Sequence, residues 1–360
     1  MKACGIVIEY NPMHWGHTYH IQQAKLVTHS DIIIGVMSAN FVQRGEPAIV
    51  SKFLRTEAAL KNGVDIVIEL PTIFSLQAAD IFGQQAIKLL QLAKVDCVCF
   101  GSESNDLDTL QEISEMSVNL NHFREKLEQG ESYASALSLS DDRLFPNDIL
   151  AISYLRALKE TSITPYSIQR TNQYHSKDLA DTLLSASAIR QNRDDPKALE
   201  QSLVSLENAV QISDFYSLIR YRLISSTSQE LSKIFMVSEG IENKFKKHAL
   251  ECPTYDEFLD SCVSRRYSKS RIQRILMHIL LNHTQEQVLS LGELNHLRVL
   301  GFTKKGREYI KETKLTIKTK AQDIPKDYFS IEVNATAIYS LISKEKDLLK
   351  KEVNKIMILE

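Results

Sequence analysis

The first half of the chain alternates short apolar runs with longer segments of helical periodicity. The apolar runs are rich in β-branched residues and occupy residues 3–9, 31–37, 64–70 and 95–100. Helical patterns follow them at residues 16–28, 51–62, 75–92 and 107–128. Short, almost continuously apolar runs are typical of strands buried on both faces of a parallel sheet, and strand–helix repetition favours right-handed crossovers. The sequence therefore predicts an α/β fold with a doubly wound parallel sheet of the Rossmann type.

A second, mainly helical domain is expected after this sheet. A helix at 147–160, a short strand near 165–169 and a helix at about 178–192 complete the first unit, and the polar segment 191–198, which contains Pro196, is typical of a linker. Few strand-like runs precede residue 314, and helices are expected at 199–210, 214–224, 227–235, 239–250, 254–263, 268–283 and 343–356. We therefore predict one domain over 1–192 and a helical one over 199–360.

The composition narrows the protein class. The formal net charge of -2 gives no global attraction to nucleic acid, so such a partner would need a local basic face. The few cysteines form no zinc-ligand pattern, which favours a reducing compartment and predicts no metal held by the protein. No signal peptide and no apolar run of membrane-spanning length is present. A cytoplasmic protein with no membrane partner is the expectation.

The strongest chemical signal is the segment EYNPMHWGHTYH, residues 9–20. It lies between the first predicted strand and the first helix, and ligands bind beyond the carboxyl ends of strands in such sheets. His14 and His17 flank Gly16 at a helix N-terminus, which already favours an anion. Two imidazoles there can hold phosphate oxygens and stabilise the charge that builds when an α-phosphate is attacked. Two histidines that only cap a surface helix are the alternative, and His20 either faces the same site or is exposed.

Further segments make a family resemblance visible. GIVIEYNPMHWGHTYH resembles the start of the bacterial tRNA(Met) cytidine acetate ligases, members of the HxGH nucleotidyltransferase superfamily. Further segments, spread along nearly the whole chain, resemble the same family. They are residues 36–60, 63–71, 100–104, 145–155, 168–176, 185–190, 264–276 and 297–308.

The resemblance implies an activity and its substrates. Members activate acetate with ATP, release pyrophosphate, and pass the acetyl group from acetyl-adenylate to the wobble cytidine of elongator tRNA(Met), which gives N4-acetylcytidine. It also implies an HxGH nucleotidyltransferase-like sheet domain that binds ATP and catalyses the reaction, followed by a tRNA-binding helical domain. Acetate, ATP and elongator tRNA(Met) are therefore the expected partners.

The resemblance also implies the ATP-binding positions. They are Val7, Ile8, Glu9, Tyr10, Asn11, Pro12, Met13, His14, Trp15, Gly16, His17, Thr18, Tyr19 and His20, with Gly101, Asn147 and Arg170. Gly101 closes a strand, where the missing side chain can admit the adenine or ribose. Asn147 either bonds the nucleotide or caps its helix. Arg170 follows a strand and can clamp a phosphate.

The segment SASAIR, residues 185–190, resembles the Ser/Thr-rich segment that closes the triphosphate site in many nucleotidyltransferases. Ser185 and Ser187 would form a second phosphate cradle, and Arg190 would neutralise the departing pyrophosphate. His14, His17 and Arg190 are thus the predicted catalytic residues. A capped surface helix with a solvated arginine is the structural alternative.

A polar loop at residues 38–52 is expected to cover the substrate. Arg44 is a candidate to hold the acetate carboxylate or a tRNA phosphate, Ser38 and Asn40 are candidates to contact the adenylate, and Gln43 belongs to the same polar run. Some relatives are expected to carry Gly-His where this chain has Ala39-Asn40, which leaves the role of position 40 open. An ordinary mobile loop is the alternative.

The nucleic-acid signal is regional. A basic segment contains Arg265, Arg266, Tyr267, Lys269, Arg271 and Arg274, and a second cluster contains Arg298, Lys304, Lys305 and Arg307. Such patches can follow a phosphate backbone, with Tyr267 available to stack on a base. A charge run is usually a solvated face. Together with the resemblance, the first segment is predicted to bind tRNA.

Two other functions stay open at this point. One is an adenylyl- or cytidylyltransferase acting on a small phosphorylated metabolite, which would need the histidine motif but not a large basic domain. The other is a non-catalytic, nucleotide-dependent RNA-binding protein, which would not need His14, His17 and Arg190 together. Mg²⁺ is a candidate companion of ATP, although the sequence contains no carboxylate cluster that must hold it.

Overall fold

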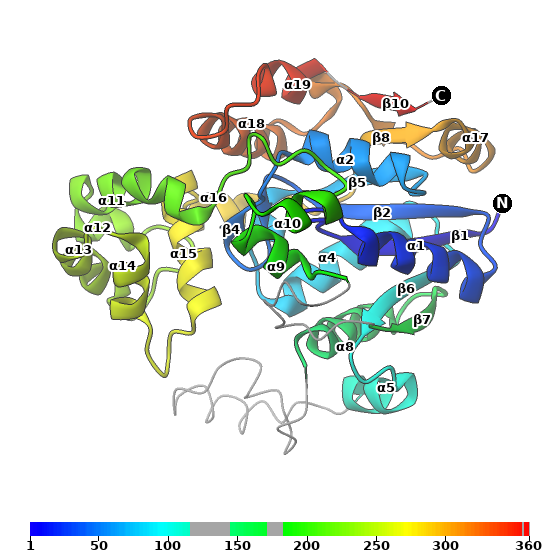
Figure 1. Cartoon of the computed structure of the whole chain (residues 1–360), viewed down its shortest axis with the longest axis horizontal. Helices are drawn as coiled ribbons and strands as arrows, with labels where there is room; N and C mark the ends of the chain where they lie inside the picture. The colour runs from blue at the N-terminus through cyan, green and yellow to red at the C-terminus, as the bar shows by residue number, and fades with distance from the viewer. Residues whose placement is uncertain (116–144, 171–182, 355, 360) are drawn as a thin grey trace.

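A parallel sheet forms the centre of the molecule (Figure 1). The computed structural model describes residues 1–115, 145–170, 183–354 and 356–359. Its parallel strands are β1 (Ala3–Ile8), β2 (Ile32–Ser38), β5 (Ile66–Leu70), β6 (Cys97–Ser102) and β7 (Thr164–Gln169), in the order β5-β2-β1-β6-β7. The predicted doubly wound sheet is confirmed. Because the strand order reverses between β1 and β6, their carboxyl ends form the topological switch point at which such folds bind ligands.

Both faces of the sheet are covered by helices. Ala3 packs with α4 (Ala79–Leu92) and α8 (Pro146–Leu158), whereas its neighbour Cys4 packs with α1 (Trp15–Thr28) and α2 (Lys52–Lys61). This alternation is why the strands are apolar at nearly every position. The short helices of this unit are α3 (Thr72–Ser75), α5 (Leu107–Glu115), α9 (Ala186–Gln191) and α10 (Pro196–Gln201).

Three of the predicted helices match the described structure only in part. The helix expected at 75–92 is divided, because α3 ends at Ser75 and α4 begins at Ala79. Of the helices expected at 107–128 and 178–192, residues 116–128 and 178–182 lie outside the described residues.

The segment after α10 is not the helix that the sequence predicts at 199–210. The helix ends at Gln201, and the chain then runs along the loops that follow β1 and β2. The Leu203 amide donates to the Met13 carbonyl (2.9 Å) and the Val210 amide donates to the Ile49 carbonyl (2.9 Å). These backbone bonds to distant loops replace the bonds that a helix would make within itself. The end of the expected linker, residues 196–198, forms the start of α10, and it is the residues after α10 that lie against the sheet unit.

The C-terminal part is mainly helical and also returns to the sheet. Its helices are η1 (Ile212–Phe215), α11 (Tyr216–Ser225), α12 (Ser228–Leu231), α13 (Ile241–Glu251), α14 (Tyr255–Cys262), α15 (Lys269–Leu281), α16 (Gln285–Ser290), α17 (Lys304–Glu312), η2 (Ala321–Asp323), α18 (Lys326–Ser340) and α19 (Leu348–Asn354). In Figure 1, α11 to α14 gather on one side of the molecule, with α15 between them and the sheet. In the part of the chain that the structure describes, none of the helices has the length and apolarity to cross a membrane.

The returning strands are the main feature that the sequence does not predict. β8 (Leu297–Thr303) pairs antiparallel with β5, β10 (Met357–Leu359) pairs with β8, and β9 (Ile317–Lys318) also joins β8. Because the charged Arg298 interrupts the apolar pattern of β8, the sequence does not indicate a strand there. The division of the chain into domains at 1–192 and 199–360 stays a prediction. A short hairpin of β3 (Phe41–Val42) and β4 (Glu46–Pro47) completes the strands.

Candidate active site

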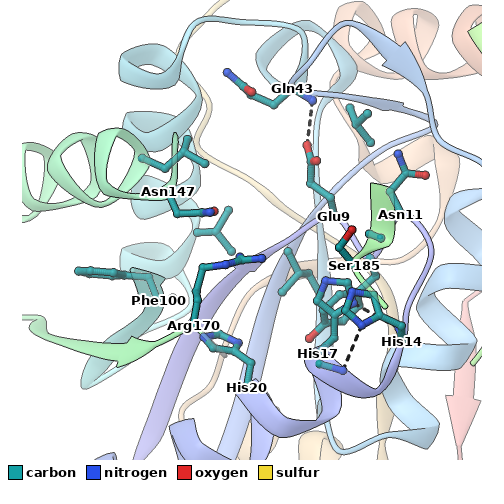
Figure 2. Close-up of a pocket in the computed structure, with 18 of the residues that line it drawn as sticks. Glu9, Asn11, His14, His17, His20, Gln43, Phe100, Asn147, Arg170 and Ser185 are labelled. Carbon is teal, nitrogen blue, oxygen red and sulfur yellow. Dashed lines mark hydrogen bonds between the residues drawn. The ribbon is translucent and has the colours of Figure 1, made fainter. Parts of the chain in front are cut away.

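A cavity of about 250 Å³ lies at the switch point of the sheet. Figure 2 shows His14 and His17 side by side on one side of it, with Phe100, Asn147 and Arg170 across from them. The predicted site residues that line the cavity are Val7, Ile8, Glu9, Tyr10, Asn11, His14, Gly16, His17, Tyr19, His20, Gln43, Arg44, Gly101, Asn147, Arg170, Ser185, Ser187 and Arg190. Side chains from β1, β6, β7, α1, α8, α9 and the β3–β4 hairpin thus meet at one place.

The two motif histidines are fixed by the backbone of the helix start. The Gly16 amide donates to Nδ1 of His14 (3.0 Å), and the His14 amide donates to Nδ1 of His17 (3.3 Å). Because Nδ1 accepts in both rings, a neutral imidazole carries its proton on Nε2. The ring centroids lie 4.0 Å apart. The pair therefore offers two N–H donors on the edges that face away from the backbone.

Burial keeps these rings neutral. Desolvation lowers the pKa of His14 to about 4, helped by the charges of Arg170 and Arg190. Desolvation also lowers the pKa of His17 well below its ordinary value, and it lowers that of His20 to about 4. His20 lines the cavity, and its buried Nε2 has no hydrogen-bond partner among the residues that the structure describes. Of the two alternatives for His20, the structure therefore has the one in which it faces the site.

Gly16 is required by His14. A Cβ at position 16 would lie 2.7 Å from Cε1 and 3.0 Å from Nδ1 of the His14 ring. That distance is shorter than real contacts, so a side chain would displace the imidazole. Close packing against His14 is therefore a local reason for glycine at position 16, in addition to the expectation that Gly16 admits the nucleotide.

Three arginines surround the cavity. Arg190 donates from Nη1 to the Asn11 carbonyl (2.7 Å) and from Nη2 to Oγ of Ser187 (3.3 Å), which fixes its guanidinium at the β1–α1 loop. Burial lowers the pKa of Arg44 and of Arg170. Glu9 is the one acidic side chain among the described residues that line the cavity. The site is therefore cationic and suited to a polyanion.

Ser185 and Asn147 make internal bonds within the site. Oγ of Ser185 accepts from the Ala188 amide (3.1 Å), so it caps α9 while it lines the cavity. The Asn147 side chain donates to the Glu103 carboxylate (2.5 Å) and does not cap α8, which begins after Phe145. Both residues are thus held in place by hydrogen bonds to neighbours while they line the cavity.

Six predicted site residues do not line the cavity: Pro12, Met13, Trp15, Thr18, Ser38 and Asn40. Met13 lies in the core, and the Trp15 side chain is exposed. Ser38 is buried, and its hydroxyl donates to the Glu9 carboxylate (3.3 Å). Asn40 was expected near the adenylate. This is wrong, because it is buried and joins Thr336 (2.8 Å) to the Lys52 amide (2.9 Å).

The loop from 38 to 52 contains the β3–β4 hairpin, which is braced by α15. Gly45 has a φ of +81°, and a Cβ there would lie 2.2 Å from the Arg274 amide nitrogen, so only glycine fits. Gln273 donates to the Glu46 carboxylate (3.0 Å), and Arg274 donates to the Gln43 carbonyl (3.3 Å). Helix α15 thus positions Gln43 and Arg44 at the cavity.

One wall of the cavity is apolar, and none of its residues was predicted from the sequence. Phe82, Phe100, Leu150 and Tyr154 line the side of the cavity formed by α4, β6 and α8. Two signals were available, since Phe100 precedes Gly101 and Leu150 lies one helical turn after Asn147. Nothing near Phe82 in the sequence points to the site.

Arg55 is a second residue that the sequence does not identify. It is buried on α2, and burial lowers its pKa to about 10. Its guanidinium donates to four backbone carbonyls, those of Glu9 (2.7 Å), Ser38 (3.0 Å), Ala39 and Val50 (3.2 Å). Arg55 therefore joins the ends of β1 and β2, from which the loops of the cavity begin.

The basic segment 265–274 is only partly exposed. Arg265, Arg266 and Lys269 are exposed, and Arg271 is half-buried. Tyr267 was expected to stack on a base. The structure contradicts this, because the ring is buried, its hydroxyl donates to the Ser238 carbonyl (3.0 Å), and the Arg271 guanidinium covers it at 4.3 Å.

Two other basic residues are also taken up by internal contacts. Arg274 is 9% exposed and braces the hairpin, so it does not belong to an exposed RNA-binding face. Arg298 is buried and pairs with Glu69 and Glu352, each at 2.6 Å. Among the predicted basic positions, the exposed ones stay candidates for tRNA contact.

Comparison with known proteins agrees with this geometry. Residues 1–354 match the family described as HIGH Nucleotidyl Transferase. The chain is 38% identical to the tRNA(Met) cytidine acetate ligase of Leuconostoc mesenteroides, over 96% of this chain and 96% of the relative. It is 37% identical to the protein of the same name from Thermoanaerobacter sp., over 97% of each chain.

Solved structures show the same fold over the full length. The chain is similar to TmcAL of Thermotoga maritima in its apo form, with a TM-score of 0.87, 28% identity and 100% coverage of both chains. The form of that protein bound with alpha-thio ATP gives a TM-score of 0.86, also with 28% identity and full coverage. With the histidine turn at the switch point and relatives matched from end to end, the chain belongs to the tRNA(Met) cytidine acetate ligases of the HIGH nucleotidyl transferase family.

Proposed function

We propose that this protein, an ATP-dependent ligase by its family, acetylates the wobble cytidine of elongator tRNA(Met) in two steps. First, a carboxylate oxygen of acetate attacks the α-phosphorus of ATP, and pyrophosphate leaves with the electron pair of the broken bond. Second, the exocyclic amine of cytidine attacks the acetyl carbonyl, AMP leaves, and the amine loses one proton. The products are N4-acetylcytidine, AMP and pyrophosphate. The related enzymes are named for this substrate, and one solved relative is described as bound with alpha-thio ATP.

The observation that carries the proposal is the pair of imidazoles at the start of α1. His14 and His17 offer Nε2–H donors while their Nδ1 atoms are held by the backbone. Donors fixed in advance stabilise the charge that develops on an attacked phosphate without reorganising during the reaction. No covalent intermediate with the protein is needed, because positioning and charge stabilisation supply the rate.

The arginines divide the remaining anionic groups between them. Arg190 is fixed against the β1–α1 loop and would hold the departing pyrophosphate. Arg44, on the braced hairpin, would hold the acetate carboxylate, with the apolar wall near Tyr154 receiving the methyl group. Arg170 follows β7 and would clamp a phosphate. Each arginine then acts on a different part of the substrates.

Mg²⁺ would accompany ATP chiefly through the phosphates. The described residues contain no cluster of His, Cys, Asp and Glu that could hold a metal by itself. Glu9 lines the cavity, and its Oε1 accepts from the Gln43 amide (2.8 Å) and from the Ser38 hydroxyl (3.3 Å). One carboxylate of this kind fits an ion that keeps most of its ligands from phosphate and water.

With tRNA as acceptor, we expect the protein to act in the cytoplasm.

The test is to incubate the purified protein with ATP, labelled acetate and unmodified elongator tRNA(Met), and then to digest the RNA. We expect labelled N4-acetylcytidine with the wild-type tRNA and none when the wobble cytidine is replaced by uridine. Pyrophosphate release that depends on acetate, without label in the RNA, would show that another acceptor is used. If neither product forms, the proposal is wrong, and a transferase acting on a small phosphorylated metabolite becomes the next candidate.

A further inference from the structure

Most of the exposed aromatic residues lie in or close in sequence to the segments that line the cavity. In the part of the chain that the structure describes, the large aromatic side chains that are well exposed are Trp15, Tyr19, Phe145 and Tyr221. Trp15 stands between His14 and Gly16, which both line the cavity, and Tyr19 lines it directly. Phe145 precedes α8 by one residue and Asn147 of the opposite wall by two. Only Tyr221 lies elsewhere, on α11.

Trp15 and Tyr19 share one face of α1. They are four residues apart, which places them one above the other on a helix. Trp15 is 49% exposed and Tyr19 is 38% exposed. A single exposed aromatic needs no explanation, but here two exposed rings lie on one face of the helix whose start carries the motif histidines, and one of them, Tyr19, lines the cationic cavity.

The proposed reaction requires an unpaired base of the RNA acceptor to reach the cavity. The amine that receives the acetyl group must reach the carbonyl that forms beside His14 and His17, so the base that carries it must leave its stack and enter at the rim. Proteins hold unpaired RNA bases on the faces of aromatic side chains, because every base has a π-face. Exposed aromatic rings on the helix that begins at an anion-binding cavity fit this need.

We propose that Trp15 and Tyr19 form the platform on which an unpaired base of the RNA acceptor stacks at the cavity mouth. The inference rests on the proposed function, because that function requires a base to enter this site. The position of the Trp15 side chain, exposed beside the motif and not within the cavity, assigns it to the acceptor and not to ATP.

Trp15 is the one tryptophan of the chain, so intrinsic tryptophan fluorescence reports on this position alone. The full-length protein is titrated with an anticodon stem-loop RNA, with a fully paired RNA duplex of equal charge, and with ATP. We expect quenching by the stem-loop, with little change for the duplex or for ATP. Equal quenching by the duplex would show an electrostatic effect and overturn the proposal. Saturable quenching by ATP in the absence of RNA would also overturn the proposal, because the platform would then hold adenine.

Kinetics give a second, independent readout. Trp15→Ala is expected to raise the KM for tRNA roughly tenfold relative to the KM for ATP, and Trp15→Phe to restore most of the loss, since a phenyl ring still stacks. Leu26→Ala, at an exposed position on the same helix, is the matched control and should leave both KM values unchanged. Unchanged tRNA kinetics in Trp15→Ala would refute the platform and leave the acetylation itself intact. If no acetylation occurs with the wild-type protein, the proposed function fails, and the fluorescence titration still decides whether RNA stacks here.

Discussion

The molecule buries charged side chains in two places that differ in how the charge is balanced. The first place, which we call the charge cluster, consists of Lys52, Glu69, Arg298, Glu332 and Glu352 on α2, β5, β8, α18 and α19. Lys52 pairs with Glu69, with Glu352 (2.8 Å) and more distantly with Glu332 (3.7 Å). The carboxylates raise the pKa of Lys52 and of Arg298 although burial acts the other way.

The cavity shows the opposite behaviour. Burial lowers the pKa of Arg44, of Arg170 and of the motif histidines, and Glu9 alone among the described lining residues is acidic. In the charge cluster the protein supplies both signs of charge, so the cluster holds strands and helices together. In the cavity, cationic side chains outnumber acidic ones among the described lining residues, so the site is suited to an anionic ligand. The difference separates a structural network from a binding site, although both are buried and rich in charge.

The largest effect on stability is expected from removing Glu352. In Glu352→Ala, Lys52 and Arg298 stay buried with one countercharge fewer, and breaking a buried pair in this way costs about 3–5 kcal/mol. Unfolding by urea, followed by circular dichroism, measures the loss. The exposed pair Glu57–Lys61, with a similar distance of 2.8 Å, is the matched control, and Glu57→Ala should change stability by less than about 1 kcal/mol. Equal losses in the two variants would remove the distinction between the buried cluster and ordinary surface pairs.

The cavity should respond in activity and not in stability. His17→Ala removes one donor from the site of phosphate attack, and we expect acetate-dependent pyrophosphate release to fall by roughly 10²–10³-fold with the fold intact. In His17→Gln the side-chain amide can stand in for Nε2–H, so part of the rate should return. Single-turnover assays with circular dichroism spectra check both. A variant that unfolds, or a His17→Ala protein with wild-type rates, would contradict the assignment.

The contiguous part of the site could be predicted from the sequence. The first strand, its turn and the start of the first helix are neighbours in the chain, so residues 9–20 reveal both their structure and their chemistry. The more distant walls, with Gly101, Arg170 and Arg190, were placed by the resemblance to a family. Phe82 and Arg55 had no signal, because their roles depend on packing between elements that are far apart in the sequence.

The errors have a common physical cause. Asn40, Arg274 and Arg298 are polar residues whose partners lie far away in the chain, and a sequence shows the charge or the amide but not its partner. Asn40 meets Thr336, and Arg298 meets Glu69 across 229 positions. The buried ring of Tyr267 is a similar case, since its cover is an arginine one helical turn later. In the sequence, a polar residue that completes the interior looks the same as one that binds a ligand, and only the fold distinguishes the two.

The two regions should have opposite dependence on pH. Glu332 has its pKa raised to about 7 by burial, from an ordinary value of 4.5, so the folded state holds the proton more tightly. The contribution of Glu332 to the free energy of unfolding is therefore present at low pH and is lost as the pH rises from 4.5 to about 7. His14 and His20 have their pKa lowered to about 4 from 6.5, so their contribution is lost as the pH falls through that range.

Urea unfolding across this pH range tests the opposition. Glu332→Gln should become more stable relative to the wild type as the pH rises, by on the order of 2 kcal/mol. Replacing His20 by Phe should reduce the loss of unfolding free energy between pH 6.5 and about 4, and it should leave the dependence above pH 6.5 unchanged. Parallel profiles for the wild type and both variants would show that neither region titrates as its burial implies.

The smallest effects are expected from the basic segment, where charges face solvent. Lys269→Ala removes one exposed cation, so it should weaken tRNA binding a few-fold and reduce the salt dependence of binding by roughly 0.7–0.9 per lost phosphate contact. Arg274→Ala differs although it is only five residues away, because Arg274 braces the hairpin that carries Gln43 and Arg44. Its loss should impair acetate-dependent pyrophosphate release in the absence of tRNA, with an unchanged salt slope. If instead both variants change only the salt slope, then Arg274 reaches the RNA in the working complex, and the bracing of the cavity by α15 is not what positions Arg44.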